Sequence, residues 1–317
     1  MTFLAGLAAL VAAIFVAGCN VPDPKGDAPL RYRDAVFATV KETPNVQYGE
    51  APGNDGTPQK LLLDVYEPAG DTAAKRPAML WMHGGGFYSG TRKDNYIAEL
   101  ARRSAKRGYV SVSISYRLLA AFTCGGEGSV EFCADAAFAA SDDERAAIRW
   151  LRKNADALRI DTNRIAIGGA SAGAVSSLLV GAAPNGSPGN SGNPGFSSEV
   201  KAVISISGAL PFNGVFGEGD APVLFWHGTK DNVVPYKWAV ANVDWMQDNG
   251  PIAFPHFVGG AGHTPVSGDT FEDMDRQARN FLYVMLSLGE LNAGGTTPPR
   301  TSPLARATAA AVAEGAQ

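Results

Sequence analysis

Ser171 lies in a sequence that could present its hydroxyl for nucleophilic attack. It is the centre of G-A-S-A-G at residues 169–173, which matches the pattern G-x-S-x-G and follows the short apolar run R-I-A-I. Small neighbours let a chain turn sharply from a strand into a helix, which leaves the serine Oγ exposed at the corner. Any tight turn also favours glycine and alanine, so a plain turn at the start of a helix stays open from this pattern alone.

A second glycine-rich turn, H-G-G-G-F at residues 83–87, follows the apolar segment P-A-M-L-W-M. Consecutive glycines expose backbone N–H groups, and such groups can stabilise the oxyanion that forms when a carbonyl is attacked. An ordinary glycine-rich turn would explain this motif by itself. The combination with a downstream G-x-S-x-G is far more specific and indicates acyl-transfer chemistry.

Such a serine needs a base, and the chain contains four histidines. His263 lies in the glycine-flanked turn G-A-G-H-T, where an imidazole can swing toward a serine. His83 belongs to the glycine-rich turn, His227 is expected to be a packed turn residue, and His256 lies inside a predicted strand. We therefore predict that His263 is the base.

The acid that orients this base is predicted to be Asp231, in the segment H-G-T-K-D-N-V-V-P. Asp231 lies past the carboxyl end of a predicted strand, where the sites of α/β proteins collect. The competing aspartates are less well placed, because Asp220 precedes its strand and Asp244 lies in the middle of a predicted helix.

The elements that must position these residues alternate between strand and helix, which is typical of a mostly parallel sheet covered on both faces. An S-x-x-E capping box at Ser141 and Glu144 is expected to open the helix that precedes the nucleophile segment. The predicted strands cover residues 60–68, 77–86, 109–118, 163–171, 200–210, 221–231 and 255–263, and the predicted helices cover residues 94–108, 142–158, 172–183, 235–249 and 269–289.

Residues from about 60 to 285 resemble the α/β-hydrolase fold, and specifically the serine carboxylesterases that carry an HGGG oxyanion motif. The resemblance rests on H-G-G-G at 83–86, S-Y-R-L at 115–118 and the segment 149–173 that ends in G-A-S-A-G. In that fold the chain order is nucleophile, acid, base. The resemblance therefore implies a triad of Ser171, Asp231 and His263.

Hydrolysis by this triad would proceed through an acyl-enzyme on Ser171. We expect the oxyanion to be held by the backbone N–H groups of Gly84, Gly85 and Ala172, the last being the residue after the nucleophile. No cofactor is expected. No metal site is expected either, because the histidines are scattered and no carboxylate cluster accompanies them.

The substrate is less well determined, and short-chain acyl or aryl carboxylic esters are the first expectation. Esterases similar to hormone-sensitive lipase carry G-D-S-A-G-G, whereas this chain has Ala170 and Ala174 at the second and sixth positions. The segment 227–235 looks more like feruloyl, acetylxylan and polyester-depolymerase relatives, so carbohydrate or polymer esters are the alternative. A binding lipoprotein without catalysis is disfavoured, because all the triad positions and oxyanion glycines are filled.

The acyl pocket is expected to be walled in part by the segment 119–140. Phe87, Tyr88 and Phe122 are candidate lining residues, and simple core packing is an equally good interpretation of these aromatic side chains.

Composition limits the remaining functions. The chain has 317 residues, 45% hydrophobic and 18% charged, with a net charge of −4. Residues 31–291 are long enough for one large domain. No run of lysine and arginine is present, so the chain has no electrostatic footprint for nucleic acid.

Both ends of the chain are predicted to lie outside the domain. Residues 1–18 have the apolar run of a secretion signal, and V-A-G-C at 16–19 resembles a bacterial lipobox, with Cys19 as the lipidated residue. An ordinary signal peptide is the alternative. Asn20 resembles the sorting residue of outer-membrane lipoproteins, so a cell-envelope lipoprotein is expected, otherwise a periplasmic or secreted protein. Residues 19–30 are predicted to be a tether and residues 292–317 a disordered tail.

Cys124 and Cys133 are predicted to form a disulfide. The cysteine count is three, and acylation of Cys19 would leave this pair in a glycine-rich loop of an exported chain. A metal site is the less favoured alternative, because no histidine lies nearby in the sequence.

Overall fold

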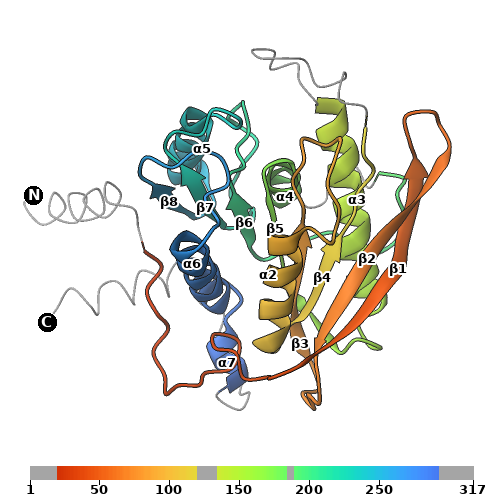
Figure 1. Ribbon diagram of the computed structural model, residues 1–317, viewed down its shortest axis with the longest axis vertical. Helices are drawn as coiled ribbons and strands as arrows, with labels where there is room; N and C mark the ends of the chain where they lie inside the picture. The colour runs from red at the N-terminus through yellow and green to blue at the C-terminus, as the bar shows by residue number, and fades with distance from the viewer. Residues whose placement is uncertain (1–19, 120–133, 184–188, 293–317) are drawn as a thin grey trace, which may run out of the picture.

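An eight-stranded sheet forms the centre of the fold, with strand order β1-β2-β4-β3-β5-β6-β7-β8 (Figure 1). The computed structural model describes residues 20–119, 134–183 and 189–292. β1 pairs antiparallel with β2, and β2 pairs antiparallel with β4. The remaining part of the sheet, β4-β3-β5-β6-β7-β8, is parallel throughout. The strands are β1 (Val40–Pro52), β2 (Pro58–Pro68), β3 (Arg76–Met82), β4 (Val110–Ile114), β5 (Ile160–Ala170), β6 (Val203–Ile206), β7 (Val223–Gly228) and β8 (Ala253–Val258).

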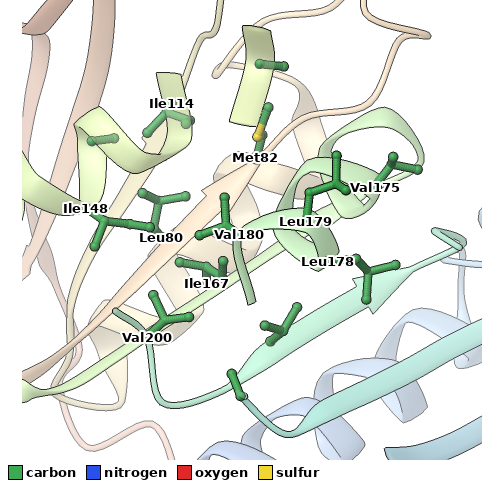
Figure 2. Close-up of a cluster of buried hydrophobic side chains, with 14 of the residues drawn as sticks. Leu80, Met82, Ile114, Ile148, Ile167, Val175, Leu178, Leu179, Val180 and Val200 are labelled. Carbon is green, nitrogen blue, oxygen red and sulfur yellow. The ribbon is translucent and has the colours of Figure 1, made fainter. Parts of the chain in front are cut away.

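Helices cover both faces of this sheet, so the predicted α/β class with a mostly parallel sheet is confirmed. One apolar core joins the sheet to α3 (Ala134–Lys153), α4 (Ala172–Ala182) and α5 (Tyr236–Asn249). Figure 2 shows part of this core, where Leu80 of β3 lies among Ile148 of α3 and Val180 of α4. The other core lies against α2 (Asn95–Lys106), α6 (Asp269–Met285) and α7 (Leu288–Asn292).

The residues V-S-V-S-I of β4 alternate between apolar and polar, a pattern that usually indicates one buried and one solvent-exposed face. Because helices cover both faces of the sheet, neither face of β4 is exposed. All five residues of β4 are buried, and the Ser111 hydroxyl donates to the carbonyl oxygen of Met79 at 3.0 Å. β3 is also buried along its whole length. Its near-continuous apolar sequence is typical of a strand in the middle of a covered parallel sheet.

The capping box predicted at Ser141 is wrong, because α3 begins seven residues earlier, at Ala134. Residues 134–140 are rich in alanine and extend the helix toward its N-terminus. Ser141 therefore lies inside the helix, where its hydroxyl donates to the carbonyl oxygen of Ala137 at 2.7 Å. Glu144 accepts a hydrogen bond from Ser177 on α4 instead of closing a cap.

The edge strand β1 is absent from the sequence-based prediction. Its residues are mostly polar and exposed, and Pro44 lies at a register shift between Thr43 and Val46. A proline and charged side chains suit an edge strand, whose outer N–H groups face solvent. Pairing with β2 defines this strand, and its sequence has no hydrophobic pattern that would predict it.

The predicted tether is docked on the domain from Asn20 onward. The Val21 amide donates to Oε1 of Gln277 at 2.6 Å, and the Asn280 side-chain amide donates to the Val21 carbonyl at 3.2 Å. Val21 is buried, and the segment then passes α6 and α7 to reach β1 (Figure 1). The signal segment, Cys19 and the tail beyond Asn292 lie outside the described residues. Within the described ranges, no helix has the length and apolar character needed to span a bilayer.

Candidate active site

The glycine-rich turn and the predicted triad residues follow four parallel strands of the sheet, with β6 between the second and the third. His83 follows β3, Ser171 follows β5, Asp231 lies beyond β7, and His263 lies beyond β8. These strands are parallel, so their carboxyl ends meet at the same edge.

Ser171 occupies a strained corner between β5 and α4. Its φ is 52° and its ψ is −119°, a conformation that L-residues rarely adopt and that is commonly found at functional sites. The Ser171 amide donates to the carbonyl oxygen of Ile206, at the end of the neighbouring strand β6, at 2.8 Å. This hydrogen bond holds the corner against the sheet edge.

The glycines around Ser171 are required by close packing. A Cβ on Gly169 would lie 2.5 Å from the backbone carbon of Gly173. A Cβ on Gly173 would lie 2.5 Å from the carbonyl oxygens of Met82 and His83. The first turn of α4 therefore lies directly against the ends of β5 and β3, which explains the small residues of G-A-S-A-G.

The structure brings the three predicted triad residues into one hydrogen-bonded chain. Nε2 of His263 lies 2.9 Å from the Ser171 Oγ, and Nδ1 of His263 lies 2.7 Å from Oδ2 of Asp231. A carboxylate can only accept, so Nδ1 carries the imidazole hydrogen. Nε2 is then the acceptor for the serine hydroxyl, as a general base must be.

The Asp231 carboxylate is held by two backbone amides as well. Its Oδ1 accepts from the amides of Val233 at 2.9 Å and Val234 at 3.0 Å. Burial alone would raise the pKa of Asp231, but hydrogen bonds from His227 and His263 outweigh burial and hold this pKa well below its usual range. Asp231 is therefore ionised at neutral pH.

The loop that carries His263 is fastened on its C-terminal side. The Thr264 amide donates to the Ser207 hydroxyl at 3.0 Å, and the Trp226 indole N–H donates to the Pro265 carbonyl at 3.0 Å. Ser207 directly follows β6 and has a positive φ of 51°. Sequence reasoning missed Ser207 and Trp226. For Ser207 the available signal was a polar residue at the carboxyl end of a buried strand, on the same edge as the triad.

The backbone of the first glycine-rich turn lies beside the nucleophile. A Cβ on Gly84 would lie 3.2 Å from the Cβ of Ser171. No acceptor among the described residues receives the amide hydrogens of Gly84 or Gly85. Ala172 is the first residue of α4, so its amide has no partner within the helix. These three amides are available to a developing oxyanion.

His83 and Tyr116 orient the peptide between Gly84 and Gly85. Both donate to the Gly84 carbonyl oxygen, from His83 Nδ1 at 2.7 Å and from the Tyr116 hydroxyl at 3.0 Å, and their rings stack with centroids 4.4 Å apart. In a trans peptide the Gly85 N–H points away from that oxygen. Burial lowers the pKa of His83, which keeps the ring a neutral donor. Tyr116 was not singled out from the sequence.

The remaining histidines differ in their relation to the site. His256 stacks on Trp226 with ring centroids 4.3 Å apart and lies 3.4 Å from Asp273, so it takes no part in the triad. His227 is fully buried and lies 3.2 Å from Asp231, a contact that sequence reasoning missed.

The rejected aspartates lie apart from the triad. Asp220 accepts the amide of Gly217 at 2.8 Å within its own loop, and Asp244 lies on α5.

The predicted substrate-lining residues differ in exposure. Phe87 is buried and packs edge-on against Tyr116 at 6.2 Å, whereas Tyr88 is 52% exposed. Phe122, Cys124 and Cys133 lie outside the described residues.

Within the described parts of the chain, no three potential metal ligands lie together.

Comparison with known proteins agrees with this architecture. Residues 63–217 match the family BD-FAE. The chain is 32% identical over 124 residues to the para-nitrobenzyl esterase of Bacillus subtilis (strain 168), which covers 37% of this chain and 23% of that protein. It is 30% identical over 165 residues to Lipase 5 of Diutina rugosa, covering 50% of this chain and 29% of that protein. The chain thus spans less than a third of the length of these curated relatives.

Solved structures resemble nearly the whole described fold. The native Est2 esterase of the planctomycete Thermogutta terrifontis superposes with a TM-score of 0.59 at 22% identity, covering 86% of this chain and 99% of that one. A truncated carbohydrate esterase from gut microbiota gives a TM-score of 0.59 at 22% identity, covering 83% and 100%. These likenesses confirm the expected α/β-hydrolase fold.

Proposed function

We propose that this chain is a serine carboxylesterase that hydrolyses short-chain acyl or aryl carboxylic esters through an acyl-enzyme. The observation that carries the proposal is the hydrogen-bonded chain Ser171–His263–Asp231, with distances of 2.9 Å and 2.7 Å, beside unpartnered backbone amides. The match to BD-FAE and the esterases among the relatives support it. The Thermogutta terrifontis esterase has been solved with propionate and with butyrate bound.

In the first half of the reaction, Ser171 Oγ forms a bond to the ester carbonyl carbon while Nε2 of His263 takes the hydroxyl proton. The carbonyl electron pair moves onto oxygen, where the amides of Gly84, Gly85 and Ala172 stabilise the negative charge. His263 then gives its proton to the departing alkoxide. Water attacks the acyl-enzyme by the same steps and releases the acid.

Asp231 keeps the imidazole in the required tautomer throughout this cycle. Its carboxylate accepts the Nδ1 hydrogen, so Nε2 stays free to accept from serine. It also stabilises the imidazolium that forms between the two proton transfers.

Replacement of the nucleophile tests the proposal. We expect Ser171→Ala to lower kcat for p-nitrophenyl acetate by about 10⁴-fold or more, with thermal unfolding nearly unchanged. Ser197→Ala, at an exposed serine in the loop that precedes β6, is the matched control and should keep wild-type turnover. Retained activity in Ser171→Ala would refute the assignment.

Carbohydrate-borne esters, such as acetyl or feruloyl groups on plant polysaccharide, are the second candidate substrate class. The BD-FAE match and the likeness to a carbohydrate esterase favour this class, and so do the departures at Ala170 and Ala174 from the pattern of hormone-sensitive-lipase-like esterases. An acyl-length series measured beside acetylxylan and methyl ferulate separates the two classes. Preference for two-carbon p-nitrophenyl esters without action on either natural ester would support the simple carboxylesterase.

We further propose that the protein is an exported lipoprotein anchored through Cys19. The sequence V-A-G-C supports this, and the docking of Asn20 and Val21 on α6 indicates that the chain immediately after Cys19 is part of the fold. In a Gram-negative host, wild-type protein should partition into detergent and carry acyl mass on Cys19. A Cys19→Ser variant that still partitions with membranes would overturn this proposal.

We also propose the disulfide Cys124–Cys133, on the sequence argument alone. Alkylation of the exported protein before reduction should leave both thiols unmodified, and alkylation after reduction should label both. Two reactive thiols before reduction would refute the bridge.

A further inference from the structure

His227, at the end of β7, places a second imidazole on the carboxylate of the candidate triad. Its Nε2 lies 3.2 Å from Oδ2 of Asp231, the same oxygen that accepts the Nδ1 hydrogen of His263. His227 is completely buried. We propose that His227 is a positioning residue that holds Asp231 and sets how strongly its carboxylate attracts the His263 proton. This inference rests on the proposed function.

The hydrogen on His227 can be assigned from its partners. Nε2 lies 2.9 Å from the carbonyl oxygen of Val234, and a carbonyl can only accept, so Nε2 carries a hydrogen. That hydrogen is shared between Val234 and Asp231. Nδ1 has no partner among the described residues, so a second proton there would be a buried charge without an acceptor. His227 therefore acts as a neutral donor, whereas His263 must gain a proton during the reaction.

With His227 included, the Asp231 carboxylate has four donor contacts, two on each oxygen. Oδ1 accepts the amides of Val233 and Val234, and Oδ2 accepts the Nδ1 hydrogen of His263 and lies 3.2 Å from Nε2 of His227. This arrangement determines the plane of the carboxylate, and with it the direction of the Oδ2 lone pair that meets His263. A second donor contact on Oδ2 restrains that oxygen against rotation away from His263.

The second imidazole also changes the electronic character of the carboxylate. Each donor withdraws electron density and makes Asp231 a weaker base, which agrees with the lowered pKa of this group. A weaker base stabilises the His263 imidazolium less strongly. Within the described residues, His227 and His263 are the ionisable groups in contact with this carboxylate, and Tyr236 on α5 faces His227 with ring centroids 6.4 Å apart.

Loss of the His227 donor therefore has a predictable sign. Asp231 becomes more basic, the imidazolium of His263 is stabilised, and the acid limb of the kcat/KM profile moves to higher pH. The freed carboxylate also orients His263 less well, so kcat falls. Removing one hydrogen bond to a charged group corresponds to about a tenfold loss.

Two substitutions test this inference. His227→Phe keeps an aromatic side chain without a donor, and His227→Gln supplies an amide N–H at a similar distance from the backbone. We expect the phenylalanine variant to show kcat about tenfold lower, KM unchanged and the acid limb shifted upward. The downfield NMR resonance of the His263 Nδ1 hydrogen should move in this variant. In the glutamine variant, both the acid limb of the kcat/KM profile and the chemical shift of the His263 Nδ1 hydrogen should return toward their wild-type values.

The outcomes are decisive in either direction. If both variants lose kcat equally while the acid limb and the resonance stay in place, His227 only packs and the inference is wrong. If the phenylalanine variant does not fold, His227→Met provides an apolar side chain without a donor in its place. The NMR measurement needs no turnover, so it reports the coupling of His227 to Asp231 even if the protein is not an esterase. Failure of the esterase proposal is detected separately, as retained activity in Ser171→Ala.

Discussion

At the residue scale, the candidate chemistry depends on which atom carries each hydrogen. The carboxylate of Asp231 accepts the Nδ1 hydrogen of His263, which leaves Nε2 to accept from Ser171. His83 donates from Nδ1 to the Gly84 carbonyl. The three imidazoles around the site, His83, His227 and His263, thus each have one tautomer imposed by an oxygen partner.

The substitution Asp231→Asn tests the tautomer argument. An amide N–H can donate to Nδ1, which would move the imidazole hydrogen to Nε2 and prevent that atom from accepting the serine proton. We expect kcat for p-nitrophenyl acetate to fall by about 10⁴-fold with KM little changed. Asp220→Asn, at the loop aspartate rejected as the acid, is the control and should keep near wild-type activity. Equal losses in the two variants would contradict the assignment of Asp231.

At the element scale, the site is assembled because parallel strands end at one edge of the sheet. β6 contributes no triad residue, yet its end supports two of them. The carbonyl of Ile206 accepts the Ser171 amide, and the hydroxyl of Ser207 accepts the Thr264 amide next to His263. The end of β6 therefore fixes the nucleophile and the base relative to each other.

Two substitutions at Ser207 distinguish the contribution of its hydroxyl to activity from the contribution of its backbone conformation. Ser207→Ala removes the acceptor of the Thr264 amide and keeps the positive φ of 51°, whereas Ser207→Gly removes the acceptor and relieves that strain. We expect both to lower kcat about tenfold, because the His263 loop is released. Full activity in both variants would show that the hydroxyl does not hold the His263 loop.

At the scale of the whole molecule, the sheet separates two apolar cores, and a buried carboxyl group lies between two helices that cover one face. Glu144 on α3 is fully buried, and its Oε1 accepts from the Ser177 hydroxyl of α4 at 2.7 Å. Its other oxygen has no partner among the described residues. Burial outweighs this hydrogen bond and raises the pKa of Glu144 from 4.5 to about 8.

The raised pKa predicts how stability depends on pH. Between the unfolded value of 4.5 and the folded value of about 8, the folded chain holds a proton that the unfolded chain releases. The free energy of unfolding therefore falls as pH rises through this window. Glu144→Gln keeps the acceptor for Ser177 and removes the ionisation, so its gain in stability should grow from pH 5 to pH 8, to on the order of 3 kcal/mol.

Thermal unfolding at several pH values checks this prediction. Glu50→Gln, at an exposed glutamate of the edge strand β1, is the control, and its effect on Tm should be small at every pH. A difference in Tm between wild type and Glu144→Gln that stays constant from pH 5 to pH 8 would contradict the prediction.

The sequence by itself determined the alternation of strands and helices, the nucleophile corner, and the candidate acid and base that the fold brings together with Ser171. These features are readable because the chemistry requires particular residue types at strand ends, and because covered parallel strands are continuous apolar runs. Sequence reasoning failed where local pattern was weak or ambiguous. The polar edge strand β1 is defined by its partner β2, and Ser141 matches a cap although it lies within a helix.

Only the tertiary structure decided which side chains support the triad. His227, Ser207 and Tyr116 lie in segments separated along the chain, and each acts through a contact with another strand end or loop. The direction of a hydrogen bond across a sheet edge depends on the register and packing of several strands, and no local pattern encodes it. The four-donor environment of Asp231 and the anchoring of the His263 loop therefore became visible only when the strand ends were seen together.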